Sequence, residues 1–244
     1  MVMISGSQTA SGQNKSSTLP QKLPSAEEVI ENYLKALGGK KRVATIRDAT
    51  YEWTIQLANQ PMGIAKTQTK TPGSVRTEMI FGNGQLISAA NARSAWTHGL
   101  DGKLHTLTDG EAAAAKLQGL LDASHLVNLK KSNVLARVVS VRESQANPVY
   151  VVEFSLRSGA RLRYLFSTIT RLPIGIEDDA RKTTTRFEDY RTEGNILEPH
   201  RVLMNTGGTG ELTFILQRAS YNTGIADSIF DSPPKTQTET PKKP

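Results

Sequence analysis

The sequence predicts a mainly β domain with some α structure (α+β), in which two or more helices cover a strongly curved antiparallel sheet of about 10–11 strands. Most segments between residues 25 and 231 alternate apolar and polar residues, the pattern of half-buried strands. Short turns rich in glycine, proline and asparagine separate them, as hairpins require. Two segments instead repeat their apolar residues with helical spacing.

The first predicted element is a helix that begins after Ser25. Ser25 suits the N-cap position, and Glu28 stands three residues later, which completes a capping box. Gly38 and Gly39 follow the last apolar residue, as expected at a helix C-terminus. The apolar residues of this segment share one helical face, namely Ala26, Val29, Ile30, Tyr33, Leu34 and Leu37.

Alternating segments follow in two runs, which predict a meandering sheet. Clear alternation occurs at residues 51–57, 75–81, 150–156, 162–166, 202–204 and 212–216. Turn signals stand at residues 60–61, 71–73, 82–84, 101–102, 158–159, 193–195 and 207–210. A sheet of this width must curl or close. Its concave apolar side then needs the helices as a cover.

The second helix is predicted between the two runs, from about residue 109 to residue 129. Asp109 is its expected cap, and the four alanines at residues 112–115 favour helix strongly. Leucines at helical spacing provide its apolar face, namely Leu117, Leu120 and Leu121.

The folded domain is expected at residues 25–231, between disordered tails at residues 1–24 and 232–244. Neither tail holds enough apolar surface to offset the entropy of ordering. Each tail carries a net charge of +2, which leaves +3 of the formal charge of +7 for the domain. Since a nucleic-acid-binding domain gathers its charge on one face, we expect no nucleic-acid partner.

Cysteine is absent, which excludes disulfides, thiolate metal sites and cysteine nucleophiles. No stretch approaches the ~20 apolar residues of a membrane-spanning helix. Residues 1–4 are too short for the apolar part of a signal peptide, whereas residues 5–24 resemble the flexible segment after a cleavage site. Two interpretations stay open: a cytosolic protein with a loose tail, or an exported protein whose signal is absent from this chain.

Residues with catalytic or metal-binding chemistry do not form a recognisable site. His98 and His105 flank a turn, where solvated side chains are commoner than a metal site. His125 is expected near the end of the second helix and His200 at a strand edge. The acidic residues 177–179 fit a solvated hairpin loop, and neither an HExxH motif nor a GxSxG elbow occurs. We expect no cofactor, no metal and no catalytic residue.

Five short segments occur in an order that resembles a known family. They are EVIENYLKALGG at 28–39, TPGSVRTE at 71–78, ISAANARSAW at 87–96, FEDYRTEGNILEP at 187–199 and IFDSP at 229–233. With a helix, hairpins, a mid-chain helix and further hairpins, they resemble the periplasmic lipoprotein carriers (LolA/LolB-like), also called outer-membrane lipoprotein-sorting proteins. The resemblance implies a half-open β-barrel lidded by helices, a cavity for acyl chains or another apolar ligand, and export.

One position departs from the family pattern. The carriers have an arginine just before the turn proline, where it tethers the lid, whereas this chain has Thr71 there with Lys70 beside it. The departure bears on lipoprotein transport more than on the fold. A relative that binds another lipid or apolar molecule fits the sequence equally well.

We therefore expect a non-catalytic, monomeric and exported carrier of a hydrophobic ligand, with transient contact to a membrane or membrane protein. The alternative is a β-shell sensor or scaffold that binds a protein partner, and a third reading is an enzyme that uses the same cavity. Alternation alone does not separate a cavity from a filled core. The residues expected to line the cavity are Trp53, Met79, Trp96, Leu121, Phe154, Phe166 and Phe214.

Overall fold

The computed structural model describes residues 23–122, 126–127, 129–143, 147–208 and 210–234. These residues form one 13-stranded sheet, in which neighbouring strands are antiparallel throughout. The strand order is β6-β5-β4-β3-β2-β1-β13-β12-β11-β10-β9-β8-β7. The predicted fold class is confirmed, although the sequence pattern predicted fewer strands.

Two meanders make up the sheet and meet where β1 pairs with β13. The first contains β1 (Asp48–Leu57), β2 (Gln60–Lys70), β3 (Ser74–Phe81), β4 (Gly84–Ala90), β5 (Ala95–His98) and β6 (Leu104–Thr106). The second contains β7 (Leu135–Arg142), β8 (Val149–Ser155), β9 (Arg161–Ser167), β10 (Pro173–Asp178), β11 (Thr183–Glu193), β12 (Ile196–Asn205) and β13 (Glu211–Tyr221).

The first helix, α1 (Ala26–Leu37), is confirmed together with its cap and its buried face. The Ser25 hydroxyl accepts a hydrogen bond from the Glu28 backbone N–H at 3.1 Å. Gly38 follows with φ of 143°, a conformation that suits glycine. A four-residue helix, α2 (Lys40–Val43), comes directly after it. The buried residues of α1 are the predicted ones, namely Ala26, Val29, Ile30, Tyr33, Leu34 and Leu37.

The second helix, α3 (Asp109–Leu120), is shorter than the prediction of 109–129. Gly119 and Asp122, both poor helix formers, stand where it ends. The predicted cap is also wrong, because Thr108 occupies the N-cap position without a side-chain bond and Asp109 is the first helical residue. A short 3₁₀ helix, η1 (Leu129–Lys131), precedes β7. His125 lies outside the described residues.

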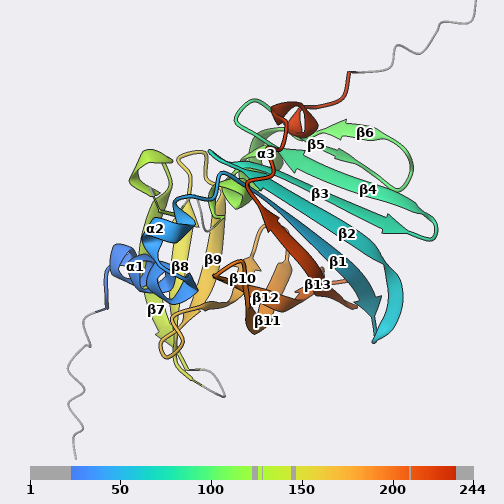
Figure 1. Ribbon diagram of the computed structural model, residues 1–244. Helices are drawn as coiled ribbons and strands as arrows, with labels where there is room; N and C mark the ends of the chain where they lie inside the picture. The colour runs from blue at the N-terminus through green and yellow to red at the C-terminus, as the bar shows by residue number, and fades with distance from the viewer. Residues whose placement is uncertain (1–22, 123–125, 128, 144–146, 209, 235–244) are drawn as a thin grey trace, which may run out of the picture.

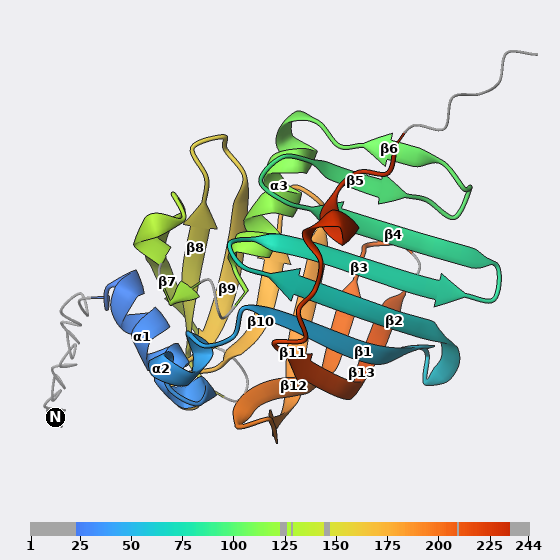
Figure 2. The same cartoon turned by 45° about the horizontal axis from the view of Figure 1, so that its top comes forward.

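The sheet is bent and half open. Its edge strands β6 and β7 stand at opposite ends of the strand order and do not pair with each other. Figures 1 and 2 show the two meanders running in different directions, with α3 between them and with α1 and α2 beside β7–β9. Helix α3 contacts β3, β4 and β5 of the first meander and β9 of the second. It therefore bridges the two halves of the sheet.

The main hydrophobic core lies between the helices and the second meander. Helix α1 contributes its whole buried face, and residues of α3 and the segment after it join this core. On the sheet side, β8 and β9 supply Val152, Phe154, Leu162, Tyr164 and Phe166. A smaller cluster around Ile55, Ala65 and Phe214 lies under the junction of the meanders.

A C-terminal segment that includes the 3₁₀ helix η2 (Asp227–Phe230) packs against the first meander. The Trp96 Nε1 donates to the Phe230 carbonyl at 3.1 Å, and the Phe230 side chain is fully buried. Asp231 accepts two hydrogen bonds from the Arg93 guanidinium at 2.6 and 2.8 Å, and one from Asn91 at 2.8 Å. These contacts fasten the end of the domain to β5.

The packing of α3 on the turn between β2 and β3 depends on Gly119. A Cβ at Gly119 would lie 2.5 Å from the Gly73 carbonyl oxygen and 3.2 Å from a methyl of Val75. We predict that Gly119→Ala lowers the free energy of unfolding by about 1–3 kcal/mol, despite the better helix propensity of alanine. Chemical denaturation followed by circular dichroism measures this.

Gly110→Ala in the same helix is the matched control. No atom lies within 4 Å of a Cβ at Gly110, so this variant should be neutral or gain up to about 1 kcal/mol. Equal stability of the two variants would contradict the close packing at Gly119.

Candidate ligand cavity

A cavity of about 330 Å³ opens on the concave side of the sheet. Its size lies at the lower end of the roughly 300–1,000 Å³ of ligand pockets, and an engineered cavity of about 150 Å³ suffices for benzene. The described residues that line it are mostly apolar and aromatic. They come from α1, α3 and the segment after it, β1 to β3 and β9 to β13.

Strand alternation aims these side chains inward. Tyr51 and Trp53 on β1, and Val75, Thr77 and Met79 on β3, follow every second position, so they share one face of the sheet. On β12, Glu198, Val202 and Met204 are separated by even numbers of residues. They therefore share one face of the strand, and they line the cavity as well. Phe214 of β13 pairs with Ile55 and Val202, which places it at the junction of the meanders.

Four of the predicted site residues line this cavity: Trp53, Met79, Leu121 and Phe214. They come from three strands and from the residue after α3, so the fold gathers positions that are far apart in the sequence. That they contact a ligand stays a prediction.

The other three predicted residues do not line the cavity. Trp96 is 3% exposed and is held by the C-terminal segment. Phe154 and Phe166 are fully buried under α1, where Tyr33 packs against Phe166 with ring centroids 5.5 Å apart. The physical reason is that α1 fills the hollow of the sheet over β8 and β9, whereas the surface over β1 to β3 stays open.

The cavity has a half-buried acidic group that sequence reasoning missed, Glu198. The hydroxyls of Tyr221 and Tyr51 both donate to its Oε1, at 2.8 and 3.1 Å. Burial raises the pKa of the Glu198 carboxyl to about 7, with a further upward contribution from Asp122 and an opposing one from the tyrosine hydroxyls. The available signal was its position on the strand. Glu198 is separated from Val202 and Met204 by even numbers of residues, which places it on the same apolar face.

The tyrosines around Glu198 act as neutral hydrogen-bond donors. Burial is the main cause that raises the pKa of Tyr51, Tyr33 and Tyr190, and the charge of Glu198 raises the pKa of each further. The hydroxyl of Tyr190 donates to the Pro173 carbonyl at 2.7 Å. The donors of Tyr51 and Tyr190 are therefore already used by acceptors of the protein.

The family's lid-tethering position has a different role here. The Thr71 hydroxyl donates to the Arg47 carbonyl at 3.3 Å, and the Lys70 ammonium binds Asp227 and the Ile225 carbonyl at 2.7 and 2.6 Å. Helix α3 instead rests on this turn by packing, since a Cβ at Gly73 would lie 2.7 Å from the Leu120 side chain. Lys70 thus fastens the C-terminal segment.

The histidines and the acidic run do not form a site. His98 pairs with Leu104, and His105 pairs with Thr97, so the two histidines point to opposite faces. Glu177, Asp178 and Asp179 bind Arg142, Arg181 and Arg163. Glu177 and Asp178 belong to β10 rather than to a loop. Within the described part of the chain, no group of three His, Asp or Glu residues could hold a metal ion.

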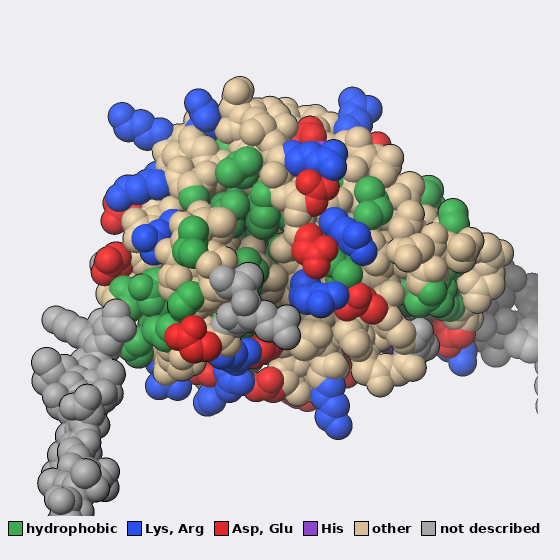
Figure 3. All heavy atoms as spheres, turned by 90° about the horizontal axis from the view of Figure 1, so that it is seen from below, with side chains coloured by type: hydrophobic (Ala, Val, Ile, Leu, Met, Phe, Trp, Pro, Cys, Tyr) green, Lys and Arg blue, Asp and Glu red, His purple; other side chains and the backbone are tan. Residues whose placement is uncertain are grey.

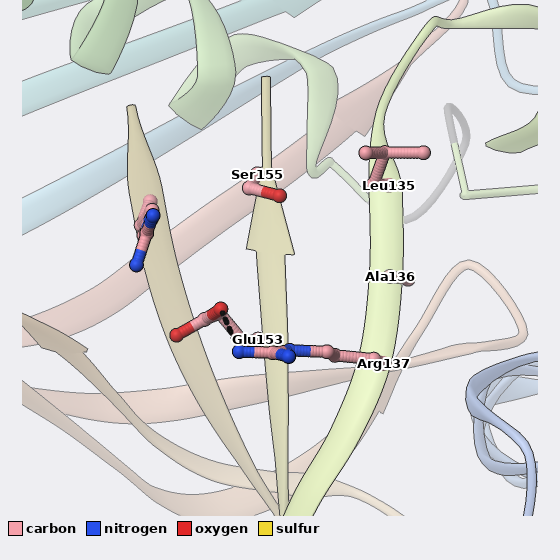
Figure 4. A pocket seen from close by; sticks show the side chains of 6 residues that line it. Leu135, Ala136, Arg137, Glu153 and Ser155 are labelled. Carbon is pink, nitrogen blue, oxygen red and sulfur yellow. Dashed lines mark hydrogen bonds and ion pairs between the residues drawn. The ribbon is translucent and has the colours of Figure 1, made fainter. Parts of the chain in front are cut away.

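A second hollow, of about 290 Å³, lies on the outer face of β7 to β9 (Figure 4). Glu153 at its floor pairs with Arg137 at 3.1 Å and with Arg163 at 3.5 Å. Acidic and basic side chains are interspersed on the face seen in Figure 3. Strands β11 to β13 carry the ion pairs Arg186–Glu211 and Arg201–Glu188. The outer hollow is a cluster of paired charges, so the concave cavity is the better candidate for a ligand site.

No protein-family model and no curated protein matches the chain. Solved structures do. A LolA superfamily protein from Nitrosomonas europaea is 12% identical with a TM-score of 0.53, covering 86% of this chain and 98% of its own. This chain and that structure share a fold.

Two further structures share it. A DUF1329 family protein from Desulfovibrio piger is 12% identical with a TM-score of 0.52, covering 84% of this chain and 97% of its own. A putative outer membrane lipoprotein-sorting protein domain from Vibrio parahaemolyticus is 12% identical with a TM-score of 0.51, covering 84% and 96%. The resemblance predicted from the sequence is thus confirmed as a likeness of fold.

Glu198 should make the stability of the protein depend on pH. Since its carboxyl pKa is raised from 4.5 to about 7 in the folded protein, the folded state binds the proton more tightly. The resulting stabilisation is complete below about pH 4.5 and is lost as the pH rises through 7, by at most about 3 kcal/mol. Glu198→Gln should remove this loss, so its unfolding free energy should exceed that of the wild type increasingly from pH 5 to pH 8.

The control for this measurement is Glu52→Gln. Glu52 is an exposed residue of the same strand as Tyr51 and points to the opposite face of the sheet. Urea denaturation at several pH values should give parallel curves for wild type and Glu52→Gln. A Glu198→Gln curve parallel to both would show that Glu198 titrates normally.

Proposed function

We propose that this protein is a non-catalytic carrier that holds an apolar ligand, such as a lipid or an acyl chain, between the curved sheet and α3. The observation that carries the proposal is the open cavity under the junction of the meanders, bounded by Trp53, Met79, Phe214 and Leu121. A filled core would leave no such volume. Burial of a ligand would contribute about 25 cal/mol per Å² of apolar surface removed from water.

The covering helix supports reversible binding. Helix α3 reaches both meanders, and the cavity-lining Gln118, Gly119 and Leu121 stand at its C-terminal end. Movement of this single element would open the cavity while leaving the sheet intact. Because the cavity already opens on the concave side, entry and release of the ligand would need at most a movement of α3 and no unfolding of the domain.

We further propose that the protein acts as a monomer outside the cytoplasm and touches a membrane or membrane protein only transiently. The shared fold with a lipoprotein-sorting domain supports export. No helix among the described residues is long and apolar enough to cross a membrane. Fractionation of cells that express the full-length gene would test the location, and recovery in the cytosol alone would contradict it.

Organic extraction of the purified protein tests the carrier function directly. We expect mass spectrometry to recover phospholipid, fatty acid or another amphiphile at a stoichiometric ratio, because the cavity fits one small apolar ligand. Protein that yields no such molecule, and that takes up no apolar dye, would refute the proposal.

The two tryptophans of the chain provide a built-in reporter. Trp53 lines the cavity, whereas Trp96 lies away from it under the C-terminal segment. In Trp96→Phe, where Trp53 is the sole reporter, an apolar ligand should change the emission by several tens of per cent. In Trp53→Phe the emission should change little. The opposite result in these titrations would place the ligand elsewhere.

A further inference from the structure

The cavity combines an apolar lining with charge of one sign. Among the described residues that line it, Glu198 and Asp122 carry acidic groups, and no lysine, arginine or histidine is present. An anionic head group beside Glu198 would meet a like charge, and the described lining residues offer no cation to compensate for it. Because electrostatic interactions strengthen in a low-dielectric interior, this arrangement disfavours carboxylate or phosphate ends.

Glu198 retains acceptor capacity for a ligand. An ionised carboxylate offers about four acceptor sites, and both tyrosine hydroxyls use the same oxygen, Oε1. Within the described part of the chain, Oε2 accepts no hydrogen bond. The Tyr190 hydroxyl is engaged with Pro173. The polar part of the cavity therefore offers acceptors more than donors.

Glu198 and the apolar residues around Phe214 lie toward different ends of the cavity. Glu198 and Met204 both line it and are six positions apart on β12, which corresponds to roughly 20 Å along the strand. Tyr51 lies at the Glu198 end, whereas Phe214 pairs with Val202, toward the Met204 end. A molecule with one polar end and one apolar chain matches this polarity.

We propose that the ligand is an amphiphile whose polar end is an amine, which donates hydrogen bonds to Glu198 while its chain lies toward Phe214 and Met204. This inference rests on the proposed carrier function and specifies the class of ligand. A charged donor to a carboxylate forms a stronger hydrogen bond than a neutral one. The amine also supplies a positive charge next to the half-buried Glu198, which no described lining residue does.

The affinity for an amine should rise with pH from about 5 to 8. In this range the ammonium stays charged, while the Glu198 carboxyl, whose pKa burial raises to about 7, becomes ionised. The groups that act on it are Tyr51 of β1, Tyr221 of β13, Glu193 of β11 and Asp122 after α3. Tyr190 and Tyr33 are coupled to it as well. The tyrosines stay neutral over this range.

Displacement of a bound apolar dye by dodecylamine, dodecanol and dodecanoate, below their micellar concentrations, tests the inference. The three compounds have the same twelve-carbon alkyl chain and differ only in the head group. For the wild type at pH 8 we expect the amine to bind about tenfold or more tighter than the alcohol, and the carboxylate to bind weakest. Glu198→Gln should reduce the amine to the affinity of the alcohol. Glu52→Gln, with the same change of charge, should keep the wild-type order.

The outcomes separate this inference from the carrier function. If dodecanol displaces the dye but the amine shows no advantage, or if Glu198→Gln keeps the advantage, the amine inference is overturned and the carrier function stands. If neither dye nor any of the three compounds binds, the carrier function fails and the inference fails with it. The unfolding curves of Glu198→Gln establish that the variant is folded.

Discussion

Strands β1 and β13 come from opposite ends of the chain, and their pairing joins the two meanders into one sheet. The register shifts between Glu52 and Trp53, and such a bulge increases the local twist and bends the strand. The site lies at this junction. Tyr51 of β1 and Tyr221 of β13 both donate to Glu198, so the pairing that joins the two meanders also builds the polar end of the cavity.

One half of the concave face is packed into a core and the other half borders a cavity, because the helices cover the two halves unequally. Helix α1 lays its apolar face on β8 and β9 and completes a packed core there. Helix α3 reaches the first meander through β3, β4 and β5, and its glycine at position 119 rests on the β2–β3 turn. The surface around Trp53, Met79 and Phe214 is therefore covered but not filled. A similar apolar lining thus yields a core in one half and a cavity in the other.

This unequal cover by the helices explains which features of the fold and the site could be predicted from the sequence. The capping box at Ser25 and the helical spacing after it are local signals, and α1 matched them residue by residue. Alternation placed Phe154, Phe166 and Phe214 on apolar strand faces with equal weight, but whether a helix lies above them is decided by tertiary structure. Glu198 shows the converse limit, because a single polar residue on an apolar face resembles an ordinary edge position until its tyrosine partners from β1 and β13 are known.

The half-buried Glu198 carboxyl with its raised pKa destabilises the folded chain at neutral pH, and a glutamine could accept the same two tyrosine hydrogen bonds without that cost. The buried Asp48 accepts hydrogen bonds from Thr223 and from the Gly224 backbone N–H, whereas the buried Asp178 binds Arg181 and the buried Glu153 binds two arginines. Glu198 is different, since no basic residue lies among the described residues that line its cavity. Residues that lower the stability of the folded protein are found mostly at functional sites. A cation brought by a ligand would give Glu198 the kind of partner that Asp178 and Glu153 have within the protein.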